Sequence, residues 1–375
     1  MVSSVTRLFV ANLATLLPRE NASSANRRIR AVNGRSPFRV RGVVPRLRRV
    51  SPREPGWTRR RAGRGFVYLD ENGNRLPEED VARVKALAIP PAWTDVWICT
   101  RPNGHLQALG VDAAGRRQYL YHPEWRVRQD ELKFARVTRA ARRLPAMRAA
   151  VLEDLAEEAM TRNKACAVAV RLIDQGAFRI GSDAYANGES FGLTTLERRH
   201  VRRAGTTLVF EFTGKSGIEH RIEVEDEPSR EAIETMRRRR GGSDRLLAFR
   251  EKGRWVDLDA GSVNDYLRER TGEDLTAKDF RTWHATVLAA TVLAESHEPG
   301  ATKASRKRAV KATMDEVAEF LGNTPAIAKA SYVDPRVVDL YEDGVTIAAA
   351  VRRAPRNPEK RQAALERAVR RLLAD

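Results

Sequence analysis

The sequence predicts an α+β protein with a small β-rich N-terminal domain, followed by a mainly α-helical domain that contains one β-hairpin. Two patterns and the chain length lead to this prediction. Between residues 56 and 130, short apolar runs alternate with turn-forming Asn, Asp and Gly, which is typical of antiparallel strands. After residue 130, apolar residues recur at helical spacing. The 375 residues are enough for two such domains.

Residues 1–55 lie outside this pattern. They are rich in Arg, Ser and Pro and have no sustained periodicity, so we expect a basic, mostly disordered N-terminal extension. The first fifty residues contain no Lys and one acidic residue, Glu20, a composition that transit peptides share. A disordered basic arm and an over-long start are the alternatives.

Residues 56–130 read as a meander of strands. One short helix, Val81 to Leu87, ends before Pro90-Pro91. Turn signals lie at 70–73, 102–104 and 112–115. The predicted strands are Phe66–Leu69, Val96–Cys99, His105–Leu109 and Arg117–Tyr121.

Residues 131–345 are expected to form the helical domain, with 346–375 as a basic helical tail. The hairpin pairs residues 207–212 with 218–224 through a turn at Gly214–Gly217. Thr276 with Asp279 resembles a capping box, which opens a helix through about Ser296. The other predicted helices are 131–158, 161–177, 303–321, 336–351 and a short one from Glu359.

The composition points to a polyanionic partner. Lys and Arg number 68 against 49 Asp and Glu, a formal charge of +19. Nucleic acid fits better than a membrane surface because no long apolar run is present. A solubilising charge excess is the alternative. Two cysteines, Cys99 and Cys166, lack metal-ligand spacing, so we expect no structural zinc and a reducing, cytoplasmic location.

Five polar residues in short motifs suggest phosphodiester chemistry. Tyr332 is a candidate nucleophile, because a phenol beside cations loses its proton more easily. Arg179 and Arg281 stand in apolar surroundings and carry planar forks suited to phosphate oxygens. Lys215, on the hairpin turn, is a candidate general acid, and Asn323 a neutral donor to the phosphate. Each has an ordinary alternative: a packed tyrosine, salt-bridged arginines, a turn lysine and a helix cap.

Spacing adds an expectation about Tyr332. Nine residues separate it from Asn323, which on one straight helix would place the two on opposite faces. The segment must therefore break or bend if both touch one phosphate, and we expect Tyr332 to be displaced when DNA is absent. His284, one turn after Arg281, could support the site, with a packing role as the alternative.

These motifs resemble type IB DNA topoisomerases of the small poxvirus and bacterial kind, over roughly residues 56–342. The resemblance implies that Arg179, Lys215, Arg281, Asn323 and Tyr332 form the active site. Poxvirus-type members carry His at the fourth position, and Asn resembles the bacterial form.

The same resemblance extends to DNA contacts. The motif Gln118-Tyr119-Leu120-Tyr121 matches a DNA-contacting motif of the family, and Tyr185 matches a DNA-contacting tyrosine. On a strand, Tyr119 and Tyr121 would share a face.

The resemblance implies a monomeric enzyme that clamps duplex DNA in the nucleoid. Tyr332 would form a 3′-phosphotyrosine, the free end would rotate, and the strand would be rejoined, with no ATP, metal or other cofactor. A tyrosine recombinase shares the fold, but it usually carries His three residues before the second arginine, where this chain has Lys278. A DNA-binding protein without catalytic activity is the other alternative.

Overall fold

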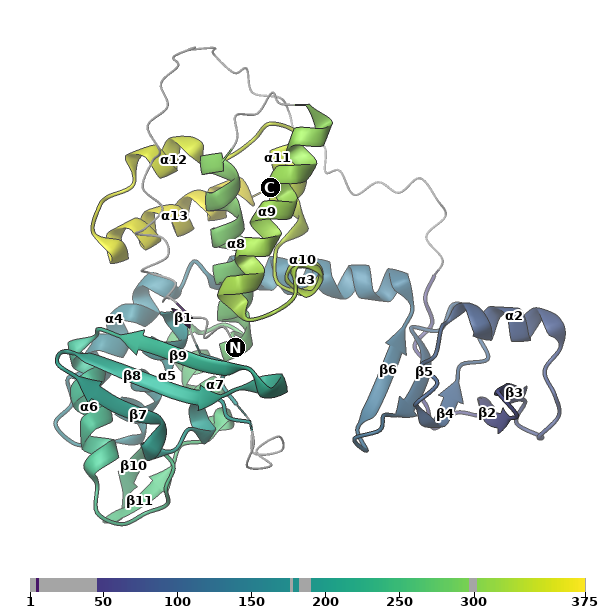
Figure 1. Ribbon diagram of the computed structural model, residues 1–375, viewed down its shortest axis with the longest axis horizontal. Coiled ribbons are helices and arrows are strands. Elements are labelled where there is room, and N and C mark those ends of the chain that lie inside the picture. The colour runs from purple at the N-terminus through teal and green to yellow at the C-terminus, as the bar shows by residue number, and fades with distance from the viewer. Residues whose placement is uncertain (1–4, 7–45, 176–177, 182–189, 297–301, 375) are drawn as a thin grey trace. The chain divides into compact units, whose positions relative to one another are not determined.

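The computed structural model describes residues 5–6, 46–175, 178–181, 190–296 and 302–374 (Figure 1). These residues belong to two compact units. The smaller unit ends at Lys133, and the larger begins at Phe134 and includes the short strand at residues 5–6. The α+β class is confirmed, because the smaller unit contains a five-stranded sheet and the larger unit is mostly helical.

The smaller unit is built on a five-stranded antiparallel sheet of order β3-β2-β4-β5-β6. All four strands predicted from the sequence are present, and the structure adds β2, an Arg-rich strand whose lack of apolar alternation hid it. Helix α2 spans Glu78–Ala86, longer than the predicted segment at its N-terminal end. The strands are β2 Trp57–Ala62, β3 Gly65–Leu69, β4 Thr94–Ile98, β5 Leu106–Val111 and β6 Arg117–Tyr121.

Strand β6 arranges the tyrosine motif as expected. The rings of Tyr119 and Tyr121 stack with centroids 6.1 Å apart and planes 14° apart, so the two side chains do share a face. Tyr119 is exposed, while Gln118 donates a hydrogen bond from Nε2 to Asp112 at 2.9 Å.

The larger unit is mainly helical. Two predicted helices are each divided: residues 131–158 fall into α3 and α4, where Pro145 starts the second helix, and 336–351 fall into α11 and α12 after Gly344. Helix α3, Pro123–Ala140, starts in the smaller unit and ends in the larger one. The other helices are α4 Leu144–Leu155, α5 Arg162–Asp174, α6 Glu227–Arg238, α7 Ala260–Thr271, α8 Ala277–Ser296, α9 Lys303–Leu321, α10 Pro325–Ser331, α11 Pro335–Glu342, α12 Ala348–Arg353 and α13 Pro358–Leu372.

The predicted hairpin belongs to a four-stranded sheet of order β1-β9-β8-β7. Strands β8, Thr207–Thr213, and β9, Glu219–Val224, form the hairpin, and β7, Val201–Ala204, pairs with β8. The two-residue β1, Val5–Thr6, pairs in parallel with β9. Most of the predicted disordered extension lies outside the described residues. Within it, residues 5–6 are in a strand, and Val50 is buried, so the expectation of disorder is wrong for these parts.

Two short strands complete the larger unit. Strand β10, Ala248–Glu251, pairs antiparallel with β11, Arg254–Asp257.

Helix α8 runs through the centre of the larger unit, with α9, α11, α12 and α13 packed around it (Figure 1). Its side chains are buried from Asp279 to Leu293. The tail helix α13 contributes Leu365 and Val369 to the same hydrophobic core. Helices α12 and α13 lie within the predicted tail, residues 346–375, and both contribute side chains to this core. No helix within the described ranges is both long and apolar enough to cross a membrane.

Candidate active site

Arg179 and Arg281 meet at the C-terminal end of α9. The Nη2 of Arg281 donates to the backbone oxygen of Leu321 at 2.6 Å, and the Nη2 of Arg179 lies 3.2 Å from the same oxygen. Arg179 also donates to the oxygen of Gly322 at 3.0 Å. Two arginines from distant parts of the chain are therefore brought together because both bind the C-terminal end of α9.

The local sequence explains why these carbonyl groups are available. Gly322 ends α9 in the left-handed conformation, with φ of 59°, and its N–H bonds back to Ala318. Glycine adopts this conformation without the steric cost of a β-carbon. The carbonyls of the last helical turn lack intrahelical partners and carry partial negative charge, which favours nearby cations.

Asn323 joins the same group. Its Oδ1 accepts a hydrogen bond from Arg179 Nη2 at 3.1 Å. Its Nδ2 is buried and has no hydrogen-bond partner among the described residues. With the oxygen occupied, the amide presents a donor, which is the polarity that a phosphate oxygen requires.

Tyr332 lies at the C-terminal end of α10, next to Arg281. The Cζ of Arg281 is 5.6 Å from the centroid of the phenol ring. The expected break in the chain is present: Asn323 precedes α10 and Tyr332 follows it, so the two residues flank a seven-residue helix. The expectation that Tyr332 would be displaced without DNA is wrong, because the ring already lies beside Arg281.

Backbone contacts hold Tyr332 there. Its N–H donates to Ala328 at 3.0 Å, and the hydroxyl of Thr286 lies 3.3 Å from its carbonyl oxygen. The same hydroxyl accepts from the N–H of Asp334 at 3.1 Å. Thr286 lies on α8, so the helix that supplies Arg281 also fixes the segment that supplies the phenol.

The electrostatics of this group favour a phenolate. Burial raises the pKa of Tyr332, but the positive charges of Arg281 and Arg179 and a hydrogen bond from Arg281 outweigh it, so the pKa lies below its usual value. Burial and the nearby charge of Arg179 lower the pKa of Arg281, and the proximity of Tyr332 opposes that change. The Nε of Arg281 is buried without a hydrogen-bond partner among the described residues. The site therefore holds excess positive charge and donors that an anion could satisfy.

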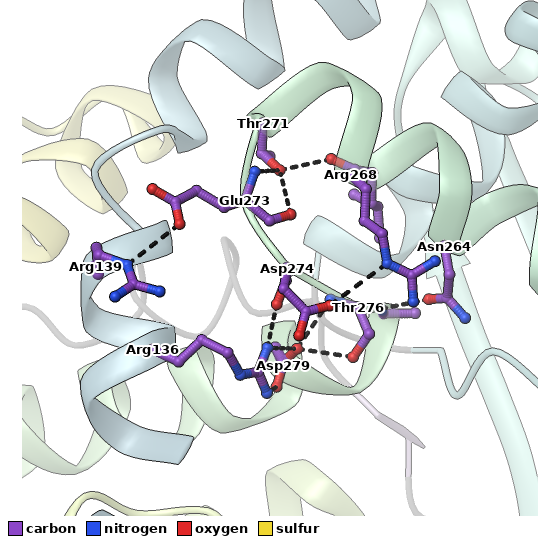
Figure 2. Close-up of polar contacts among 11 residues, drawn as sticks. Arg136, Arg139, Asn264, Arg268, Thr271, Glu273, Asp274, Thr276 and Asp279 are labelled. Atoms are coloured by element: carbon purple, nitrogen blue, oxygen red, sulfur yellow. Dashed lines mark hydrogen bonds and ion pairs between the residues drawn. The ribbon is translucent and has the colours of Figure 1, made fainter. Parts of the chain in front are cut away.

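A polar network fixes the first turn of α8, and with it Arg281 (Figure 2). The side chain of Asp279 accepts from the N–H and hydroxyl of Thr276 at 2.9 and 2.7 Å, so half of the predicted capping box is formed. Arg136 of α3 donates both terminal nitrogens to Asp279 at 2.8 Å each. Asn264 of α7 accepts from the N–H of Ala277 at 3.0 Å.

Lys215 is not brought into contact with the other four residues. It is exposed on a short 3₁₀ turn, Lys215–Gly217, at the tip of the β8–β9 hairpin. The adjacent Gly214 lines a pocket together with Arg179 and Arg281, so the lysine is attached to the edge of the site.

Five further residues were predicted to contact DNA. His284 is fully buried, with Nε2 3.4 Å from Asp174, which Arg148 also binds. This placement fits the packing alternative and does not offer His284 to DNA. Tyr185 lies outside the described residues. The motif of Gln118, Tyr119 and Tyr121 belongs to the smaller unit.

The structure adds two residues that the sequence did not reveal as site members. The charge of Lys278 contributes to the lowered pKa of Tyr332. His220 of β9 lines the pocket with both arginines. A lone histidine in a strand carries no signal of its own, but the hairpin register, which places it opposite Phe212, could have indicated its position near the turn.

Comparison with known proteins agrees with this arrangement. The family model described as eukaryotic DNA topoisomerase I, catalytic core, matches residues 122–351, more than half of the chain. The chain belongs to this family. A second model, bacterial DNA topoisomerase IB, N-terminal domain, matches residues 65–112 in the smaller unit. The protein is therefore a DNA topoisomerase of type IB, and its substrate is DNA.

Individual relatives include viral and plant enzymes. DNA topoisomerase 1B of Acanthamoeba polyphaga mimivirus is 28% identical over 298 residues, covering 77% of this chain and 88% of the relative. DNA topoisomerase 1B of vaccinia virus (strain Copenhagen) is 22% identical over 300 residues, covering 74% and 88%. DNA topoisomerase 1 of Daucus carota is 34% identical over 130 residues, covering 34% of this chain and 15% of the relative.

Proposed function

We propose that the chain relaxes positive and negative supercoils by cutting one strand through a 3′-phosphotyrosine, letting the free end rotate, and rejoining the strand. The observation that most supports this proposal is the meeting of Arg179, Arg281 and Asn323 at the end of α9, with the phenol of Tyr332 beside Arg281. These are the groups that covalent attack on a phosphodiester requires.

The proposed chemistry begins at Tyr332. The phenolate oxygen attacks the scissile phosphorus and forms a P–O bond, while the bond from phosphorus to the 5′-oxygen breaks. Arg179, Arg281 and the Nδ2 of Asn323 stabilise the charge on the non-bridging oxygens. Lys215, carried by its hairpin turn, gives the leaving 5′-oxygen a proton. Rejoining reverses each step, and the phosphotyrosine retains the energy of the original bond, so the proposal requires neither ATP nor a metal.

We assign the DNA contacts by unit. Residues 56–130 would form one half of a clamp on duplex DNA, with Gln118, Tyr119 and Tyr121 as its DNA-contacting residues, and residues 131–345 would form the catalytic half. Tyr185 is a further DNA contact implied by the family resemblance. All five proposed catalytic residues lie on one chain, which supports a monomer acting on nucleoid DNA.

Relaxation of supercoiled plasmid in EDTA without ATP tests the reaction. We expect wild type to relax both positively and negatively supercoiled plasmid, and Tyr332→Phe to relax neither. Tyr341→Phe is the matched control, because it also removes a tyrosine hydroxyl, in this case a buried one with no hydrogen-bond partner among the described residues. The control should keep full activity.

The polarity of the covalent link is tested separately. A duplex labelled on the 5′ side of the cleavage point should give a labelled protein adduct, because a 3′-phosphotyrosine retains that fragment. A labelled adduct formed only from the opposite fragment, or formed by Tyr332→Phe, would contradict the mechanism.

A further inference from the structure

His220 lies in the pocket of the two arginines, although no role has yet been given to it. It projects from β9 opposite Phe212 of β8, and the two rings stack with centroids 5.1 Å apart. The pocket that it lines includes Arg179, Arg281 and the end of α9 at Gly322. His220 is thus half-buried at the place where the proposed scissile phosphate would bind.

Gly214 makes room for this ring, and Gly322 lies on its other side in ordinary contact distance. A β-carbon on Gly214 would lie 2.5 Å from Cδ2 and 2.6 Å from Nε2 of His220, closer than such atoms approach one another. A β-carbon on Gly322 would lie 3.7 Å from Cε1 of the same ring and 4.0 Å from Nη2 of Arg179. The imidazole therefore rests on the base of the Lys215 turn and also faces the helix end that holds the arginines.

The charges around His220 keep it neutral in the free protein. Burial lowers the pKa of His220, the charges of Arg179 and Arg281 lower it further, and Glu219 opposes them weakly. A neutral imidazole retains one N–H donor. An anion placed between the arginines would reverse the local field and favour the protonated ring.

We propose that His220 is a further catalytic residue, whose imidazole donates a hydrogen bond to a non-bridging oxygen of the scissile phosphate held by Arg179 and Arg281. This inference rests on the proposed function and deepens it. The hairpin then supplies two groups to one phosphate: Lys215 to the leaving oxygen from the turn, and His220 to the non-bridging oxygen from the strand.

Two substitutions separate this role from simple packing. His220→Phe keeps an aromatic ring against Phe212 but removes the donor, and His220→Gln keeps a side-chain N–H but loses the ring. We expect single-turnover cleavage to fall by about 10²-fold in His220→Phe, the scale of losing one such donor. His220→Gln should retain a rate at least about tenfold above that of His220→Phe. DNA affinity should change little in either variant. Wild-type cleavage by His220→Phe would overturn the proposal and leave only packing.

A second measurement does not depend on cleavage. The ring of His220 can be titrated by NMR in the Tyr332→Phe protein, both free and saturated with a short DNA duplex. Its signal is assigned as the one that disappears in the double variant that also carries His220→Gln. We expect the pKa of His220 to rise when DNA binds, because the phosphate charge offsets that of the arginines, and an unchanged pKa would overturn the inference. If the wild-type protein never cleaves DNA, the proposed function is wrong. The titration would still decide whether His220 contacts the bound phosphate.

Discussion

Replacing Arg136 with Ala should destabilise the larger unit by about 3 kcal/mol. Arg136 binds Asp279 through two hydrogen bonds of 2.8 Å, and the side chain of Asp279 is 5% exposed. Removing one partner of a buried ion pair costs about 3–5 kcal/mol, because the other charge is left uncompensated. The side chain of Arg136 is 26% exposed, which places the expected loss at the low end of that range.

The chain provides a matched control one helical turn away. Arg139 also lies on α3 and pairs with Glu273 at 3.2 Å, but its side chain is 62% exposed (Figure 2). The Glu273 side chain is 19% exposed, but with an exposed arginine the pair resembles a surface ion pair, which contributes about 1 kcal/mol or less. Arg139→Ala removes the same type of side chain and the same charge, so the difference between the two variants reports the contacts of Arg136 with Asp279 and with the backbone oxygen of Asp274.

Thermal unfolding followed by circular dichroism measures the effect. For a unit of this size, about 2–4 °C per kcal/mol predicts that Arg136→Ala lowers Tm by about 6–12 °C, with a much smaller change for Arg139→Ala. Adding Asp279→Asn to Arg136→Ala should recover part of the loss, because the uncompensated charge disappears. Equal Tm values for Arg136→Ala and Arg139→Ala would refute the reasoning.

Three further predictions concern the reaction. Arg281→Ala should lower single-turnover cleavage by about 10²–10³-fold, since one donor to the transition state is lost, and cleavage within tenfold of wild type would contradict its role. The cleavage rate should rise with pH and level off once the pH exceeds the lowered pKa of Tyr332. In Arg179→Gln the rise should continue to higher pH, because a cation that lowers that pKa is gone, and an identical pH–rate profile would argue against Tyr332 as the titrating group. DNA affinity, measured by fluorescence anisotropy, should fall by about 10³-fold or more between 50 and 200 mM salt if six or more phosphates are contacted; a flat salt dependence would rule out a clamp on the DNA backbone.

Local signals in the sequence were enough to predict many of the elements. Turn residues between short apolar runs located β3 to β6, and helical spacing located α9 from its first residue to its last. The errors arose where an apolar pattern continued across a break. Residues 131–158 and 336–351 keep helical periodicity throughout, so the apolar pattern does not indicate where the helix breaks. The breaks after α3 and α11 come instead from Pro145 and from the positive φ of Gly344. Strand β2 was missed because its Arg side chains do not alternate with apolar ones.

The site was predictable in its residue types and only partly in its geometry. Arg179, Arg281, Asn323 and Tyr332 each have an ordinary alternative, and they could be chosen because their motifs, in order and spacing, together resemble those of the family. Their common acceptor, the carbonyl of Leu321, is a backbone atom and leaves no trace in the residue type. The position of Tyr332 was predicted wrongly, because spacing along one helix cannot indicate that Thr286, on another helix, holds the segment in place.

The way the two arginines are held affects how an anion would enter the site. Among the described residues no carboxylate pairs with Arg179 or Arg281, and their hydrogen-bond acceptors are the carbonyls at the end of α9, the amide oxygen of Asn323 and the side chain of Tyr332. An incoming phosphate would not have to displace a competing anion of the protein. Binding and release would then proceed without breaking an internal ion pair, which suits an enzyme that must let go of the same phosphate after every rejoining. The same openness leaves the site accessible to other oxyanions, so high concentrations of inorganic phosphate or sulfate should compete with DNA there.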